Sequence, residues 1–167
     1  DNITNIEVKN LPSKTKFKTL DGNDISLNEE DIMICSEDDP LCLGGVFGGL
    51  DSGVTSNTKN IFLESAMFNP ISIRKSSKRH SIHTEASFRF ERGIDPEMVL
   101  YALKRASILI KNDCPKSISS NIIQENNLKL DEKKIFLRYN EINSISGKII
   151  DKDVIVSILN SLDVTVE

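Results

Sequence analysis

Residues 44–49 read Gly-Gly-Val-Phe-Gly-Gly, residues 61–66 read Ile-Phe-Leu-Glu-Ser-Ala, and residues 89–93 read Arg-Phe-Glu-Arg-Gly. Paired glycines are expected where a side chain would obstruct the backbone or a neighbouring group. The apolar run at 61–66 predicts a β-strand, whose period of two places the Glu64 carboxyl on the same face as Phe62. This part of the chain therefore predicts a cleft that contains one carboxylate.

The chain before this stretch has the pattern of an antiparallel sheet. Between residues 6 and 35, short apolar patches alternate with turn residues such as Asp21-Gly22-Asn23, which is typical of β-hairpins. Residues 32–35 and 41–43 continue the strand pattern. We therefore expect several short antiparallel strands on the N-terminal side.

Helical periodicity first appears after Asp95-Pro96, where the aspartate can cap a helix and the proline fits its first turn. Apolar residues then recur at helical intervals, at Val99, Leu103, Ala106 and Ile110. Residues 117–123 predict a further strand. The fold class that follows is α+β, with an antiparallel-rich sheet and flanking helices.

The last part of the chain predicts a second, smaller domain. Its expected elements are a strand at 135–138, a short helix at 140–146 closed by Gly147, a helix with Val154, Ile158 and Leu162 on one stripe, and a terminal strand. A unit of this size buries too little surface to be stable alone. We expect a first domain over residues 1–128 and a partial, α/β-mixed domain over residues 129–167.

Composition indicates a globular protein of a reducing compartment. The 167 residues are 38% hydrophobic, which is enough for a packed core. Cys35, Cys42 and Cys114 follow no metal-binding or redox spacing, which favours reduced, mostly buried thiols in a cytoplasmic protein. No apolar run approaches the roughly 20 residues that cross a bilayer. The chain begins with Asp1 rather than Met, so we expect a segment of a longer protein.

Positive charge is concentrated in residues 74–92. This block holds six Lys or Arg residues and two acids, a net charge of +4 in a chain whose total is −4. A cationic face on an acidic protein can bind a phosphate backbone, although charge runs are also typical of a solvated helix surface. The cations expected to flank the cleft are Arg74, Lys75, Lys78 and Arg79. Arg89 and Arg92 flank Glu91 and are expected to form internal salt bridges instead.

The side chains that could carry chemistry are few. Glu64 either pairs with a nearby arginine or accepts a hydrogen bond from a ligand hydroxyl. The two histidines, His80 and His83, fit a surface or phosphate-contacting role better than that of a general base. The hydroxyl residues have no Gly-x-Ser-x-Gly turn around them, and the chain has no metal-ligand cluster, P-loop or dinucleotide motif. We therefore expect neither a metal nor a cofactor in this chain, and no catalytic residue is identified.

The motifs of residues 44–96, taken in order and spacing, closely resemble the editing region of the bacterial phenylalanyl-tRNA synthetase beta subunit. The resemblance implies sheets packed as a sandwich with helices outside. It also implies hydrolysis of tyrosine wrongly attached to phenylalanine tRNA, by a positioned water. Glu64 would recognise the phenolic hydroxyl, and Gly48, Thr84 and Ala86 would shape the pocket. The four cations beside the cleft would then contact the acceptor end of the tRNA.

The same resemblance implies a cellular setting. The parent subunit would take part in protein biosynthesis in the cytoplasm, as a ligase assembled from two alpha and two beta chains. The alpha chain would hold the ATP and magnesium chemistry. Neither a membrane nor DNA is implied as a partner.

The chain also departs from the family pattern. An upstream arginine and histidine that the family uses are absent from this chain, Ser81 stands where glycine is common, and Glu85 stands where aspartate is more frequent. The first departure is compatible with slow or absent hydrolysis by this segment alone. Two alternatives are a non-catalytic RNA-binding or scaffold module, and the related domain of tRNA lysidine synthetase, which the unit after Gln124 disfavours.

Overall fold

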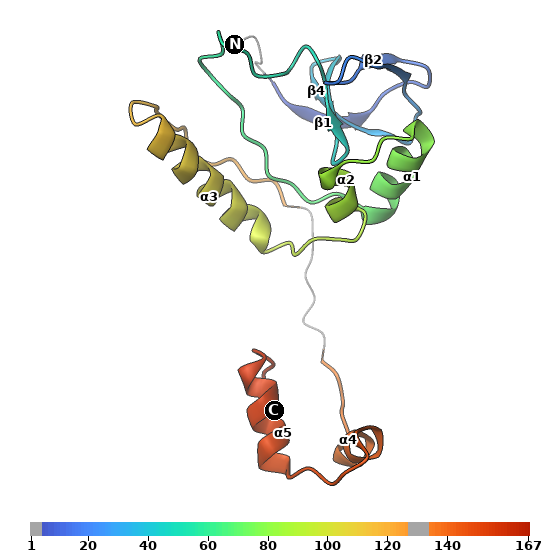
Figure 1. Cartoon of the computed structure of the whole chain (residues 1–167), viewed down its shortest axis with the longest axis vertical. Coiled ribbons are helices and arrows are strands. Elements are labelled where there is room, and N and C mark those ends of the chain that lie inside the picture. The colour runs from blue at the N-terminus through green and yellow to red at the C-terminus, as the bar shows by residue number, and fades with distance from the viewer. Residues whose placement is uncertain (1–4, 127–133) are drawn as a thin grey trace. The chain divides into compact units, whose positions relative to one another are not determined.

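The computed structural model describes residues 5–126 and 134–167, which divide into two compact units (Figure 1). Unit 1 is Asp1–Ser120 and unit 2 is Asn121–Glu167. Within the described residues, unit 1 holds six strands and three helices, and unit 2 holds two helices. The domain boundary predicted between residues 128 and 129 falls among residues 127–133, outside the described residues.

A four-stranded antiparallel sheet, in the order β1-β4-β5-β6, forms the centre of unit 1. Met33 of β4 pairs with Leu43 of β5, and both side chains are fully buried. The register shifts between Ile34 and Cys35, which marks a bulge in β4. The strands are β1 (Glu7–Asn10), β4 (Ile32–Ser36), β5 (Asp39–Leu43) and β6 (Phe47–Gly48).

A second sheet contains two antiparallel strands, β2 (Lys16–Lys18) and β3 (Asp24–Ser26). The turn between them includes Gly22 with a φ of 88°, a conformation that suits glycine. Phe17 of β2 is buried in the same core as the central strands β4 and β5. The Leu20 amide donates to the Gly48 carbonyl at 2.9 Å and links the two sheets. The α+β fold class and the predicted hairpins are confirmed.

Helix α1 (Pro70–His80) was not expected, because the sequence places the first helical periodicity after residue 96. That expectation is wrong. The Asn69 side chain caps the helix by accepting a hydrogen bond from the Ile71 amide at 2.9 Å, and Pro70 occupies the first turn. The buried face combines Ile73 with two serines, Ser76 and Ser77. Buried serines hide the apolar period by which a helix is normally recognised.

Two further helices complete unit 1. Helix α2 (Glu85–Phe90) also precedes residue 96, and Thr84 caps it. Helix α3 (Met98–Asp113) follows Asp95-Pro96 as predicted, and the Asp95 side chain accepts a hydrogen bond from the amide of residue 97 at 3.0 Å. The four apolar residues predicted for its inner face are all half-buried: Val99, Leu103, Ala106 and Ile110.

The strands predicted from apolar runs outside the hairpins are wrong. Residues 61–66 are irregular, and so are residues 117–123. Within residues 5–126 and 134–167, no strand pairs with the first of these segments. The Ser65 hydroxyl in this segment donates to the Val99 carbonyl of α3 at 2.9 Å. Apolar content alone does not distinguish a β-strand from an irregular segment that packs beside a helix, and residues 61–66 are of the second kind.

Unit 2 contains helices α4 (Tyr139–Ser146) and α5 (Lys152–Ser161), both close to their predicted positions. Gly147 ends α4 with a φ of 70°, as expected. The strands predicted at residues 135–138 and at the C-terminus are irregular, so the expected α/β mixture is not seen within the described residues 134–167.

Unit 2 buries little of its apolar surface. In the described residues of this unit Ile155 is the one buried hydrophobic side chain. Phe136 is 84% exposed and Ile149 is 91% exposed. This agrees with the expectation that so short a unit lacks a core of its own.

Candidate functional site

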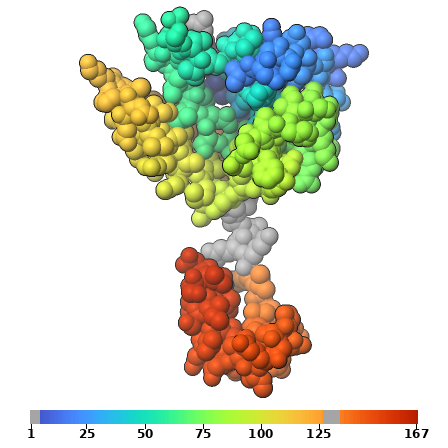
Figure 2. Space-filling model, viewed as in Figure 1, coloured from blue at the N-terminus to red at the C-terminus, as the bar shows by residue number. Residues whose placement is uncertain are grey.

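A cavity of about 670 Å³ lies within unit 1. Its walls are the β5–β6 hairpin, residues 64–66, α2 and the first turns of α3. Figure 2 shows α3 in yellow at one edge of unit 1, beside residues 50–66 in teal. Cavities of this size are typical of sites for small ligands.

All four residues predicted to shape the pocket line this cavity: Gly48, Glu64, Thr84 and Ala86. They come from β6, an irregular segment, the cap of α2 and the first turn of α2. The fold therefore brings together residues that lie up to 38 positions apart in the chain. Their roles in binding stay predictions.

Glycine stands at the paired positions 44–45 and 48–49 for different local reasons. A Cβ on Gly45 would lie 2.9 Å from the Phe68 ring, and a Cβ on Gly49 would lie 2.6 Å from the Leu41 carbonyl. The expected obstruction is therefore confirmed at these positions. At Gly48 it is wrong, because a Cβ there would meet nothing within 4 Å. Gly48 leaves open space in the cavity wall, and any side chain at this position would reduce the volume left for a ligand.

Glu64 lines the cavity without a protein partner. Among residues 5–126 and 134–167, its carboxyl forms no hydrogen bond or ion pair, so the predicted alternative of an arginine salt bridge is not observed. Although the residue is exposed, neighbouring protein atoms displace part of the water around the carboxyl, and this desolvation raises its pKa above the ordinary value. The group can accept a hydrogen bond from a donor that enters the cavity.

Thr84 and Ala86 form the α2 side of the cavity. The Thr84 hydroxyl donates to the Val46 carbonyl at 2.7 Å and accepts from the Ser87 amide at 3.0 Å. These bonds fasten α2 to the glycine-rich hairpin, so Thr84 positions the wall and its donor is already engaged. Ala86 leaves room beside it, since its side chain is a single methyl group.

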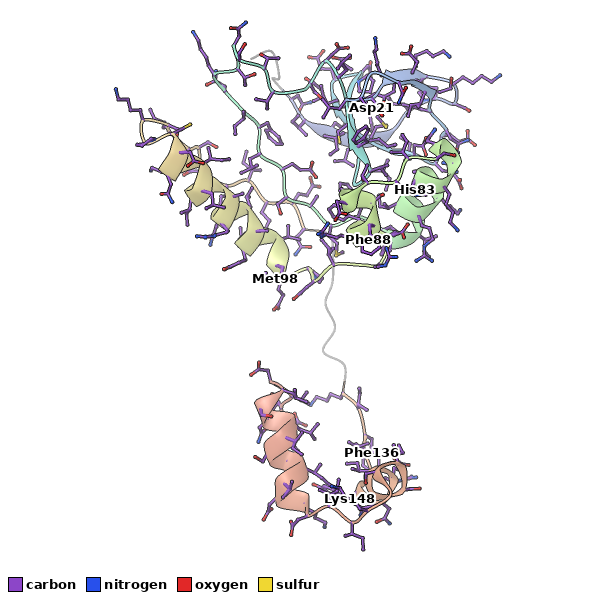
Figure 3. The ribbon with its side chains drawn as sticks, in the orientation of Figure 1. Asp21, His83, Phe88, Met98, Phe136 and Lys148 are labelled. Atoms are coloured by element: carbon purple, nitrogen blue, oxygen red, sulfur yellow. The ribbon has the colours of Figure 1, made fainter. Side chains whose placement is uncertain are left out.

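Aromatic and aliphatic side chains supply most of the remaining wall. The rings of Phe68 and Phe90 meet edge to face with centroids 5.2 Å apart. Met98, labelled in Figure 3 at the start of α3, lines the cavity together with Val99. Met98 and Val99 were missed as site residues in the sequence, although their place in the first turn after Asp95-Pro96 was available as a signal. The lining suits an apolar group such as an aromatic ring.

The charged groups in the lining are acids. The described lining includes Glu64, Glu85 and Asp95, and it includes no Lys, Arg or His. Glu85 pairs with Arg89 at 2.6 Å, and Asp95 caps the turn before α3. Glu64 is thus the acid in the described lining that has no partner to satisfy it.

His83 lies outside the cavity. It lines a separate depression of about 370 Å³ together with Phe88 and Glu91, and Figure 3 labels both His83 and Phe88. Its Nδ1 is 3.5 Å from the Ser77 hydroxyl. No group of three or more metal-binding side chains occurs in the part of the chain that the structure describes.

His80 belongs to a buried network around Asp31, so the expected surface or phosphate-contacting role is wrong for this residue. Its Nε2 is 2.6 Å from Asp31 Oδ2, while Arg79 Nη1 and the Ser76 hydroxyl lie 2.6 Å and 2.7 Å from Asp31 Oδ1. Burial acts to raise the pKa of the Asp31 carboxyl, but the hydrogen bonds from Ser76, the Asn28 amide and His80 outweigh it and hold that pKa below the ordinary value.

The four cations predicted to contact tRNA do not line the cavity. Arg79 is engaged with Glu30 and Asp31, and Lys75 lies 3.3 Å from Glu30. Arg74 donates to the Glu91 carbonyl at 3.2 Å. Lys78 is exposed and has no ion-pair partner within the described ranges. Arg89 and Arg92 form salt bridges as predicted, with Glu85 and Glu91.

The three thiols are free but differ in burial. Cys35 is buried, Cys42 is half-buried and Cys114 is exposed, so the expectation of mostly buried thiols fails at Cys114. Cys42 lines the cavity. Burial, assisted by the nearby negative charge of Glu64, raises the pKa of this thiol to about 12, so it is neutral at pH 7.

Comparisons with known proteins give a consistent result. Residues 1–115 match the family described as the B3/4 domain. The chain is 45% identical over 159 residues to a protein named phenylalanine-tRNA ligase beta subunit from Bacteroides fragilis (strain YCH46), a match that covers 95% of this chain and 19% of the relative. Proteins of the same name from Porphyromonas gingivalis (strain ATCC BAA-308 / W83) and Vibrio vulnificus (strain YJ016) are 44% and 35% identical over 96% and 91% of this chain.

The chain spans about a fifth of the length of these relatives, since the matches cover 20% of the Porphyromonas protein and 19% of the Vibrio protein. The resemblance seen in the sequence is confirmed. Among the described residues, no helix has the length and apolar character needed to cross a membrane.

Proposed function

The chain belongs to the B3/4 domain family, and from this membership we propose that it proofreads tyrosine wrongly attached to phenylalanine tRNA, as part of a phenylalanine-tRNA ligase beta subunit. The observation that carries the proposal is Glu64, a partly desolvated carboxylate that has no partner among the described residues and lines a cavity with aromatic walls. A phenolic hydroxyl is a donor of the right kind for such a group.

The need for a second site follows from the chemistry of tyrosine and phenylalanine. An apolar synthetic pocket rejects a substrate that merely adds a hydroxyl by only about 10²-fold. A site that hydrogen-bonds the hydroxyl rejects the substrate without it by about 10⁴-fold or more. Phenylalanine in this cavity would leave Glu64 desolvated and unpaired, which opposes its binding. Tyrosine would supply the missing donor.

The reaction is hydrolysis of the ester between the amino acid and the terminal ribose of the tRNA. A water oxygen bonds to the ester carbonyl carbon, the bond from that carbon to the ribose oxygen breaks, and the ribose oxygen takes a proton. In this chain, the Glu64 carboxylate orients the substrate by binding the hydroxyl of the tyrosine side chain, and Gly48 and Ala86 leave room for the tyrosine ring. The hydroxyls in the described lining, Ser65 and Thr84, donate to backbone carbonyls, and that lining includes no histidine to activate them, so a positioned water is the nucleophile in this proposal.

The basic face of α1 is the proposed contact for the acceptor end of the tRNA. Lys78 and Arg74 are the most available cations, because Arg79 and Lys75 already pair with Glu30 or Asp31. Phosphate contacts of this kind position a nucleic acid without reading its sequence. We include Lys75 and Arg79 as secondary contacts.

The setting of the whole protein is part of the proposal. The chain would act in the cytoplasm within a ligase of two alpha and two beta subunits. ATP and magnesium would be used mainly through the alpha subunit. The chain itself would need no cofactor.

Deacylation of charged tRNA tests the proposal. With the chain carried in an assembled ligase, we expect tyrosyl-tRNA to be hydrolysed faster than phenylalanyl-tRNA by about 10⁴-fold. Glu64→Ala should reduce that preference by about 10- to 100-fold, the value of a hydrogen bond to a charged group. Glu29→Ala removes an exposed carboxylate outside the cavity and is the control. Equal hydrolysis of both esters, unchanged by Glu64→Ala, would contradict the proposal.

A second candidate is a non-catalytic RNA-binding module. The observation that favours it is the absence of a histidine from the described lining. This candidate predicts tRNA binding that depends on Lys78 and Arg74, together with no hydrolysis of either ester. The same assay, run beside a tRNA-binding titration, separates the two functions.

A further inference from the structure

Cys42 lines the same cavity as Glu64. It pairs with Gly48 across the β5–β6 hairpin, and paired residues project to the same face of a sheet. Gly48 has no side chain and leaves open space. At this register position Cys42 is therefore the side chain that limits the cavity.

The orientation of the thiol is fixed by the backbone. Cys42 Sγ lies 3.4 Å from the Phe47 carbonyl and 3.6 Å from the Leu43 carbonyl, so the thiol hydrogen is directed at the protein. The neutral sulfur is left to contact whatever enters the cavity, and sulfur packs favourably at the edge of an aromatic ring. Cys42 and Glu64 line the same cavity, and the negative charge of Glu64 helps to raise the pKa of this thiol.

We propose that Cys42 is a specificity-determining residue, which sets the width of the cavity beside Glu64 and excludes phenols that carry a substituent next to the hydroxyl. The inference rests on the proposed function, because it assumes that the hydroxyl reaches Glu64. A substituent on the ring carbon next to the hydroxyl makes the phenol wider, and Cys42 is a side chain of the cavity wall that would have to admit it. The tyrosine ring fits beside the Cys42 sulfur, whereas the added methyl group of 3-methyltyrosine would clash with it.

The test uses tRNA charged with tyrosine or with 3-methyltyrosine, and the ligase that carries the chain. Cys42→Ala removes the sulfur, which is similar in size to the added methyl group. We expect this variant to raise the rate for 3-methyltyrosine relative to tyrosine by about 10-fold, the effect of one methyl-sized group in an apolar pocket. Cys42→Leu should act in the opposite direction and lower the rate for tyrosine by about 10-fold or more.

Cys114→Ala is the matched control, because Cys114 is an exposed thiol outside the cavity. It should leave both rates as in the unmodified protein. A structural role of Cys42 alone would move both substrates in the same direction for both variants. Opposite changes for the smaller and larger side chains support the inference.

The outcomes separate this inference from the proposed function. If the unmodified protein hydrolyses tyrosyl-tRNA but Cys42→Ala leaves the ratio of the two substrates unchanged, the inference about Cys42 is overturned and the proposed function stands. If the unmodified protein hydrolyses neither ester, both are overturned. Circular dichroism of Cys42→Leu checks its fold, and Cys42→Ala alone decides the question if that variant is unfolded.

Discussion

Asp31 and Glu64 are two carboxylates of unit 1 with opposite surroundings. Asp31 is 1% exposed and accepts hydrogen bonds from Ser76, Arg79 and the Asn28 amide, with His80 at 2.6 Å. Glu64 borders a cavity and has no hydrogen-bond or ion-pair partner in the described residues. A carboxylate whose hydrogen bonds are satisfied by the protein stabilises the fold, whereas an unsatisfied carboxylate in a cavity is available to a ligand.

The greatest loss of stability is expected for a substitution of Asp31. Asp31→Ala leaves Arg79 and His80 without their shared partner and should lower the free energy of unfolding by about 3–5 kcal/mol, as for other broken buried ion pairs. Glu64→Ala removes no hydrogen bond or ion pair within the described residues and should change the free energy of unfolding by less than about 0.5 kcal/mol. Urea denaturation of both variants checks the difference. Similar losses of stability would show that Glu64 is also structural.

The paired glycines give the next effect. Gly49→Ala would place a Cβ 2.6 Å from the Leu41 carbonyl and force the backbone to shift, so we expect a loss of about 1–3 kcal/mol in unfolding free energy. Gly48→Ala meets nothing within 4 Å and should fold normally, while its methyl group reduces the cavity. Thermal unfolding measures the loss of stability in Gly49→Ala. The effect of a smaller cavity is measured as the rate of tyrosyl-tRNA hydrolysis by Gly48→Ala and by the bulkier Gly48→Leu, which should both be slower than the unmodified protein. A normal rate for Gly48→Leu would show that the ligand binds elsewhere.

Thr84 also lines the cavity, but its hydroxyl, like the Asp31 carboxylate, already has hydrogen-bond partners in the protein. Thr84→Val removes the helix cap and the bond to the Val46 carbonyl, so the free energy of unfolding should fall by about 1–2 kcal/mol. Thr58→Val, in an exposed turn, is the control. Full stability of Thr84→Val, measured in urea, would mean that this hydroxyl does not fasten α2 to the hairpin.

The smallest effect is in the pH dependence of stability. The pKa of Asp31 is lowered in the folded state, so its contribution is present above its unfolded pKa of about 3.9 and is lost as the pH falls through the folded value. The pKa of Glu64 is raised, so its contribution is present below about pH 4.3 and is lost as the pH rises through the folded value.

Unfolding free energies measured between pH 3 and pH 7 test these signs. Relative to the unmodified protein, Asp31→Asn should lose less stability on acidification, and Glu64→Gln should lose slightly less as the pH is raised. If both substitutions altered the pH dependence of the unfolding free energy in the same direction, the two carboxylates could not have the opposite surroundings described above.

Local patterns predicted much of the fold. Turn residues marked the hairpins, Asp95-Pro96 marked α3, and Gly147 marked the end of α4. Helix α1 was missed because its buried face contains two serines, of which Ser76 donates to Asp31, 45 residues away in the chain, and Ser77 donates to the Ile82 carbonyl. Sequence periodicity carries no information about such long-range partners.

The candidate site was predicted in part. The resemblance selected Gly48, Glu64, Thr84 and Ala86, and the fold brings them to one cavity. Cys42 was missed because its place depends on the strand register that sets it opposite Gly48. The engagement of Arg79 with Asp31 was missed because the partners are 48 residues apart.

A crystal structure with a non-hydrolysable tyrosyl ester analogue tests whether Glu64 binds the phenolic hydroxyl. We predict that its phenolic oxygen lies about 2.5–3.0 Å from a Glu64 carboxylate oxygen, with the ring between Gly48 and the α2 wall. The matching phenylalanine analogue should leave the cavity empty at the same concentration. A structure in which Glu64 binds a guanidinium group, or in which both analogues bind equally away from Glu64, would contradict the account.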